Sequence, residues 1–186
     1  ATERSPHFGF AWARVAELEF SFGRTRAARE AVDRALQLTP QNAQAHALNG
    51  FLLAAENRLR QAITSFDHAI AIDPGLANGW LGRGLCKRRL GWLQRDTEPS
   101  WQSDLQTAAA LEPRRSLVRS YAGKAFGDAG DLRLAQKELV YARRLDTKDP
   151  TPLLYSALLN QQANRVNEAV EDLQESIALN DNRAVY

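Results

Sequence analysis

The side chains that most often carry catalysis are few in this sequence and do not form a recognisable set. None of its three histidines has a second histidine or a cysteine at the spacing of a metal site. His46 falls at a position that holds tryptophan elsewhere in the chain, so we expect a packed ring, whereas His68 is expected to face solvent. Cys86 is the single cysteine, which excludes an internal disulfide, and we expect it to be a small buried residue.

Glycine-rich stretches can cradle phosphate groups, but the one in this chain has a different interpretation. Gly79, Gly82 and Gly84 lie within a predicted helix, where they allow another helix to approach closely. No nucleotide-binding or nucleophile-elbow motif occurs, and the carboxylates are dispersed. We therefore expect a protein that is not an enzyme and that uses no cofactor or metal ion.

Basic residues are concentrated between positions 83 and 119, where eight of them stand against four acidic residues. Such a region can bind an acidic partner or a phosphate, or its charges can be solvated and paired within the protein. Arg83 and Lys87 either extend their charged ends to solvent or pair with Asp104. Aromatic platforms of the kind that stack on bases are not expected beside these residues, so nucleic acid is not an expected partner.

The composition is that of an ordinary soluble chain. It has 186 residues, of which 44% are apolar and 25% charged, with a net charge of +2. No apolar run approaches the ~20 residues of a membrane span, so no membrane insertion is expected, and no signal peptide is visible. Because the sequence contains no methionine, we interpret it as a mature form or an excised fragment and assign it to no compartment.

The elements that position these residues recur along the chain. A turn residue, glycine or asparagine, returns at steps of 34, 34, 39 and 34 residues. A small residue and an aliphatic residue follow it in each unit, at steps of 34, 39, 34 and 34 residues. The step of 39 marks five extra residues in the third unit. The turn column is Gly23, Asn57, Gly91, Gly130 and Asn164, the small column Ala28, Ala62, Trp101, Ala135 and Ala169, and the aliphatic column Leu38, Ile72, Leu111, Leu145 and Leu179.

This 34-residue period, with Pro40, Pro74 and Pro113 two residues after the aliphatic column, resembles the tetratricopeptide repeat, an array of helix–turn–helix units. The resemblance implies an all-α fold, a right-handed α-α superhelix without strands, with helix breaks at the turn and proline columns. We divide the chain into a leader or tail of a preceding repeat (1–8), five repeats (9–42, 43–76, 77–115 with the insertion, 116–149 and 150–183) and the start of a truncated helix (184–186).

The second and third repeats give two local predictions. Gly50 should allow close packing within the second helix pair, with Ala62 facing it. Trp101 stands where the other repeats have alanine, so the third pair should open or slip in register, with the indole largely buried. The inserted segment 92–100 is expected to project from one edge of the array or to lengthen the helix before it.

In the family, the first helix of each repeat lines a concave groove. The positions that would face the groove do not carry the basic clamp for acidic chaperone tails or the asparagine ladder of O-linked N-acetylglucosamine transferases. They are largely apolar, and we expect about half of them, Leu48 and Tyr121 first, to pack between neighbouring helices. A long exposed apolar stripe usually marks a binding site. The predicted partner-binding residues are Phe51, Leu81, Leu85, Arg88, Arg89, Lys124, Leu154 and Leu158.

The sequence thus predicts a scaffold that binds a protein or peptide segment in this groove, as part of a larger protein. Basic residues beside the apolar positions would favour an acidic segment. One alternative is a self-assembly module that stacks on copies of itself through uncapped ends. Another is a binder of an acidic or phosphate-bearing ligand at residues 83–119, whose affinity would fall steeply with salt.

Overall fold

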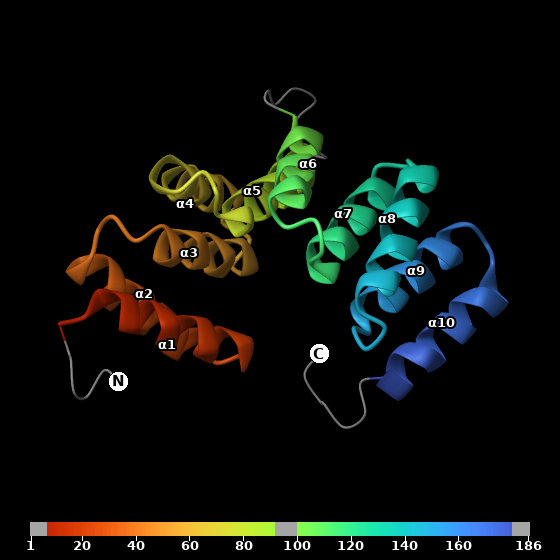
Figure 1. Ribbon diagram of the computed structural model, residues 1–186, viewed down its shortest axis with the longest axis horizontal. Coiled ribbons are helices and arrows are strands. Elements are labelled where there is room, and N and C mark those ends of the chain that lie inside the picture. The colour runs from red at the N-terminus through yellow and green to blue at the C-terminus, as the bar shows by residue number, and fades with distance from the viewer. Residues whose placement is uncertain (1–6, 92–99, 180–186) are drawn as a thin grey trace. The chain divides into compact units, whose positions relative to one another are not determined.

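The computed structural model describes residues 7–91 and 100–179, and within these ranges the chain forms ten α-helices and no strand (Figure 1). Each odd-numbered helix packs against the even-numbered helix that follows it. The helices are α1 (Gly9–Ser21), α2 (Thr25–Leu38), α3 (Ala43–Ala55), α4 (Leu59–Ile72), α5 (Ala77–Gly91), α6 (Trp101–Leu111), α7 (Ser116–Asp128), α8 (Leu132–Leu145), α9 (Thr151–Gln162) and α10 (Val166–Leu179).

The described helices belong to two compact units. The first contains α1 to α6 and the second contains α7 to α10. Within a unit, the second helix of a repeat also packs on the first helix of the next, as α4 does on α5 and α8 on α9. Predictions for most of the inserted segment (92–99) and for residues 184–186 concern parts of the chain outside the described ranges.

The helix ends confirm the predicted breaks. Four residues of the turn column adopt the left-handed backbone that ends a helix: Gly23, Asn57, Gly130 and Asn164, with φ of 73°, 61°, 85° and 57°. Gly91 differs from the prediction, because it is the last residue of α5 and does not have a positive φ. The insertion begins directly after this residue.

A phenylalanine packed between two glycines holds α3, α4 and α5 together. Phe66 of α4 is completely buried. A Cβ atom built on Gly50 would lie 2.6 Å from Cε1 of Phe66, and one built on Gly82 would also overlap the ring. The close approach predicted at Gly50 is present, and the atoms nearest to this glycine belong to the Phe66 ring. That Ala62 also faces Gly50 stays a prediction. The ring is too large to coexist with any side chain at either glycine.

The third helix pair keeps the spacing of the others despite Trp101. A Cβ atom built on Gly84 would lie 3.1 Å from the carbonyl oxygen of Trp101, and one built on Gly123 would lie 3.1 Å from that of Ala135. Trp101 thus meets Gly84 through its carbonyl group, as Ala135 meets Gly123, and neither local opening nor a slip in register is needed. The indole is half-buried rather than largely buried, and the guanidinium carbon of Arg88 lies 5.6 Å from its ring centroid.

The turn column provides a test of the backbone argument. We expect Gly23→Ala to lower the free energy of unfolding by about 1 kcal/mol, because a Cβ atom disfavours a φ of 73°. Gly91→Ala is the matched control, since the Cβ would also enter open space but the backbone is not left-handed. Urea denaturation of both variants measures the difference. An equal loss of unfolding free energy from both substitutions would show that the left-handed backbone at Gly23 is not what requires glycine.

Candidate functional site

The first-helix face of the first unit is more closed than the sequence indicates. Leu48, as predicted, packs in the core, and Leu81 is also only 3% exposed. Phe51 is half-buried, with its ring edge-to-face on Phe66 at a centroid distance of 5.0 Å, and Leu85 is half-buried as well. Among the predicted binding residues of this face, Phe51 and Leu85 therefore keep accessible apolar surface, and Leu81 contributes to the core instead.

The two arginines predicted beside this surface have different environments. Arg88 is buried, and its guanidinium lies near the Trp101 ring. Arg89 is exposed, and its Nη1 donates a long hydrogen bond of 3.5 Å to the carbonyl oxygen of Ala54 on α3. Only Arg89 is placed where its charge can reach a ligand on the surface.

The first-helix face of the second unit exposes more apolar surface. Leu154 and Leu158, one turn apart on α9, are 40% and 41% exposed. Tyr121 of α7 packs on Tyr155 of α9 with ring centroids 5.6 Å apart, in agreement with the prediction that Tyr121 fills the space between neighbouring first helices. The apolar residues on this face are thus partly held by packing and partly presented to solvent.

A shallow hollow between α7 and α9 adjoins this apolar surface. Tyr155, Leu158 and Lys124 line it, over a floor that includes Gly123 and Gly127. The ammonium of Lys124 donates to Asp128 at 2.6 Å, and this pair is only partly buried. The hollow therefore combines an aliphatic edge, an aromatic wall and a cation that is already engaged by a carboxylate.

Several cations of the basic region are paired with carboxylates inside the protein. In the first unit, Arg83 donates to Asp104 at 3.0 and 2.6 Å and to Asp67 at 2.8 Å, and Lys87 donates to Asp104 at 2.9 Å. In the second unit Arg119 donates to Glu138 at 3.0 Å. These pairs confirm the predicted pairing with Asp104. They also weaken the case for a phosphate site, because Arg83, Lys87 and Arg119 already have carboxylate partners.

The network around Asp104 is largely removed from water. The side chains of Asp104, Lys87 and Arg83 are 1%, 8% and 12% exposed. Burial by itself lowers the pKa of Arg83, but the hydrogen bonds and charges of Asp104 and Asp67 outweigh it, and the pKa is raised overall. The guanidinium also lies over the Trp80 ring, 4.7 Å from its centroid. Arg83 consequently stays charged at every pH at which the protein is handled.

The residues with catalytic potential have structural roles in the described chain. The half-buried His46 ring places Nε2 2.8 Å from the carbonyl oxygen of Pro40. Nε1 of Trp80 donates to the carbonyl oxygen of Pro74 at the same distance. The two rings therefore occupy the same position in their repeats, as predicted. His68 is exposed, although its ring contacts that of His46. Burial raises the pKa of the Cys86 thiol to about 12, despite the opposing charge of Arg89.

In the described part of the chain, no group of three or more histidine, cysteine, aspartate or glutamate side chains is arranged to hold a metal ion. No described helix combines the length and the apolar character that crossing a membrane requires.

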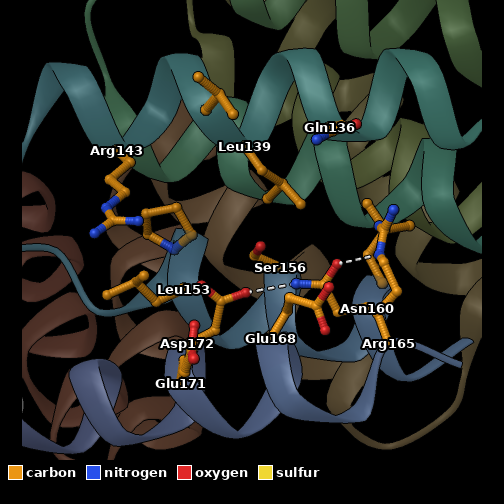
Figure 2. Close-up of a pocket in the computed structure, with 13 residues that line it drawn as sticks. Gln136, Leu139, Arg143, Leu153, Ser156, Asn160, Arg165, Glu168, Glu171 and Asp172 are labelled. Carbon is orange, nitrogen blue, oxygen red and sulfur yellow. Dashed lines mark hydrogen bonds between the residues drawn. The ribbon is translucent and has the colours of Figure 1, made fainter. Parts of the chain in front are cut away.

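A cavity in the second unit was missed by the sequence analysis. It has a volume of about 260 Å³, is open to solvent, and is lined by residues of α8, α9 and α10 (Figure 2). Its lining contains Ser156, Asn160 and Asp172, on the side of α9 opposite Leu154 and Leu158. The repeat columns contained a signal for it, since Ser156 and Asn160 stand at the positions of Arg83 and Lys87.

The chain was compared with known proteins. No protein-family model matches the sequence, and no curated protein matches it either. Among solved structures, a thermophilic TPR protein of Thermus thermophilus is similar with a TM-score of 0.84 and 19% identity, over 94% of this chain and 93% of that one. The fold is that of a tetratricopeptide-repeat protein.

Two further structures with this fold show how widely it is shared. Cut9, in a hetero-tetramer of APC/C with Hcn1, gives a TM-score of 0.79 at 19% identity, over 98% of this chain and 36% of that one. The pilF protein of Pseudomonas aeruginosa gives a TM-score of 0.69 at 20% identity, over 91% and 75%. The all-α tetratricopeptide architecture predicted from the repeat columns is thus confirmed.

The buried network offers a test of its energetic importance. Asp104→Asn leaves the ammonium of Lys87 facing a neutral amide, and we expect the free energy of unfolding to fall by about 3 kcal/mol. Asp67→Asn is the matched control, because Asp67 also accepts from Arg83 but is 50% exposed, and its loss should stay below about 1 kcal/mol. Urea denaturation distinguishes the two. Equal losses would show that burial adds nothing to the contact.

Proposed function

We propose that this protein is a non-catalytic interaction scaffold that binds a protein or peptide segment along its first helices. The main observation in its support is that Leu154 and Leu158 are exposed beside the hollow that Tyr155 and Lys124 line. Exposed aliphatic residues one turn apart on a rigid helix suit an extended or helical peptide that places its own apolar side chains between them. Phe51, Leu85 and Arg89 form the corresponding surface of the first unit.

Similar structures support this proposal. The structure of YrrB, which is described as a TPR protein with an unusual peptide-binding site, covers 100% of this chain at a TM-score of 0.57 and 17% identity. Cut9 was solved in complex with another protein, Hcn1. The chemistry of the surface adds a preference: Arg89 and Lys124 favour a segment with acidic residues beside its apolar ones, since such charges steer and orient the ligand.

The proposal can be tested with peptides selected on the full chain from a displayed library. We expect the double substitution of Leu154→Ser with Leu158→Ser to weaken binding by roughly tenfold or more, because exposed aliphatic anchors carry the contact. Fluorescence anisotropy with the selected peptides measures this loss. The double substitution of Val170→Ser with Ile177→Ser is the matched control, as it removes two exposed aliphatic residues from a second helix of the same unit. If only the control loses binding, the first-helix site is refuted.

A second candidate function, self-assembly, rests on a different surface. Val166, Val170, Leu173 and Ile177 recur at three- and four-residue intervals on α10 and are exposed, Ile177 by 72%. The corresponding residues of α4 include Phe66, which α5 covers. The exposed stripe of α10 is therefore the face on which a further helix would stack in a repeat array, and we propose a second copy of the chain as its occupant in this alternative.

Sedimentation velocity distinguishes the alternative. If the chain self-assembles through α10, its sedimentation coefficient rises with protein concentration, and Ile177→Glu abolishes the rise by placing a charge in the apolar contact. Leu158→Glu is the control, because it places the same charge on the first-helix face. A sedimentation coefficient that does not change with concentration would remove self-assembly as a function of this surface.

A further inference from the structure

The cavity between α8, α9 and α10 occupies a place that is filled elsewhere in the same chain. In the second and third repeats the equivalent place holds the guanidinium of Arg83, which is bound by Asp104 of α6 and Asp67 of α4. Lys87 reaches the same Asp104 carboxylate, and Trp80 stacks on the guanidinium. This arrangement is an internal template for a cation held between three consecutive helices.

Each residue of this template has a counterpart at the equivalent repeat position that lines the cavity. Ser156 replaces Arg83, and Asn160 replaces Lys87, so both cations are lost. The acceptor is retained, because Asp172 stands at the position of Asp104. The two remaining counterparts, of Asp67 and Trp80, are Val140 and Leu153.

The first two repeats use the same place in another way. There Arg29 of α2 donates to Asn49 of α3 at 2.6 Å and to Glu56 at 2.6 Å, and Asn49 donates to Ser65 of α4 at 2.8 Å. Asn49 is the counterpart of Arg83 and of Ser156 in the repeat columns. A guanidinium therefore sits at this junction in both pairs of repeats within the first unit, although it comes from different helices.

The carboxylate of the cavity is oriented but not neutralised. Asp172 Oδ2 accepts from Asn160 Nδ2 at 2.8 Å, and Asn160 Oδ1 accepts from Arg165 Nε at 3.0 Å (Figure 2). No ion pair joins Asp172 to a cation among the residues that the structure describes. One oxygen of the carboxylate thus keeps its capacity to accept, while a neutral amide fixes the side chain.

The wider lining leaves the cavity with negative charge. Arg143, at one end, is engaged by Glu175 on the outside of the cavity, with both carboxylate oxygens 2.6 Å from Nη2. Gln136 and Leu139 of α8 face the carboxylates of α10 across the cavity, as Figure 2 shows. Three carboxylates therefore stand against two arginines in the lining: Glu168, Glu171 and Asp172 against Arg143 and Arg165.

We propose that this cavity binds the guanidinium of an arginine side chain supplied by a partner protein. The guanidinium takes the place that Arg83 fills in the first unit and donates to Asp172, while its aliphatic stem lies along Leu139 and Leu153. A planar guanidinium suits the place better than an ammonium, because its fork of donors can bind a carboxylate and a neighbouring oxygen together. The site lies on the opposite side of α9 from the proposed peptide surface and is independent of it.

The test uses small probes on the full chain, followed by two-dimensional ¹H–¹⁵N NMR. N-acetyl-arginine amide should bind with a Kd of roughly millimolar magnitude and shift the amide resonances of α8, α9 and α10. N-acetyl-citrulline amide has nearly the same shape without the charge, and it should bind at least about tenfold more weakly. Equal binding of the two probes, or shifts confined to other helices, would overturn the proposal.

Two variants locate the site. Asp172→Asn should weaken the arginine probe about tenfold or more, whereas Asp128→Asn, which removes a carboxylate from the other face of the unit, should leave its Kd unchanged. Ser156→Arg restores the internal guanidinium, so it should abolish probe binding and raise the melting temperature. Should this variant fail to fold, the comparison of Asp172→Asn with Asp128→Asn decides alone. Unchanged binding by Asp172→Asn would refute the site.

Discussion

The structure depends on the close approach of helices at positions where a side chain is nearly absent. Gly50 and Gly82 leave room for the ring of Phe66, and Gly84 and Gly123 meet the backbone carbonyls of Trp101 and Ala135. These contacts set the distance between helices before larger side chains fill the remaining space. A change in the opposing residue is tolerated when the contact is made by the backbone, which explains why a tryptophan stands in a column of alanines.

The junction between successive repeats is the second constraint, and this chain satisfies it in three ways. Arg29 reaches across from α2 in one case, and Arg83 arises from α5 and meets a buried carboxylate in another. In the last case Ser156 and Asn160 leave a cavity beside Asp172. Asp172 is half-buried and accepts from a neutral amide, so this junction keeps the carboxylate without the internal cation that the first unit places beside it.

The sequence was sufficient for the architecture because the repeat columns carry backbone information. Left-handed turns require glycine or asparagine, and prolines end helices, so the breaks could be placed to within a few residues. The candidate site was harder to predict from the sequence. The groove positions came from the resemblance to the family, which does not say how exposed each side chain is. Leu81 and Leu154 occupy equivalent places on their helices, as do Leu85 and Leu158, yet Leu81 is buried and Leu154 is exposed. That difference arises from neighbouring helices, and no local pattern contains it.

The burial of Cys86 has a practical consequence for following motion in this protein. The thiol lies in the core between α4 and α5, and its raised pKa keeps the thiolate population very small while the structure is closed. In an opened state the pKa returns toward about 8.5, and a disulfide reagent reacts readily. Because the chain has one cysteine, the labelling rate reports exposure of this one site, with no engineered probe. Its dependence on denaturant separates partial opening of the third repeat from global unfolding.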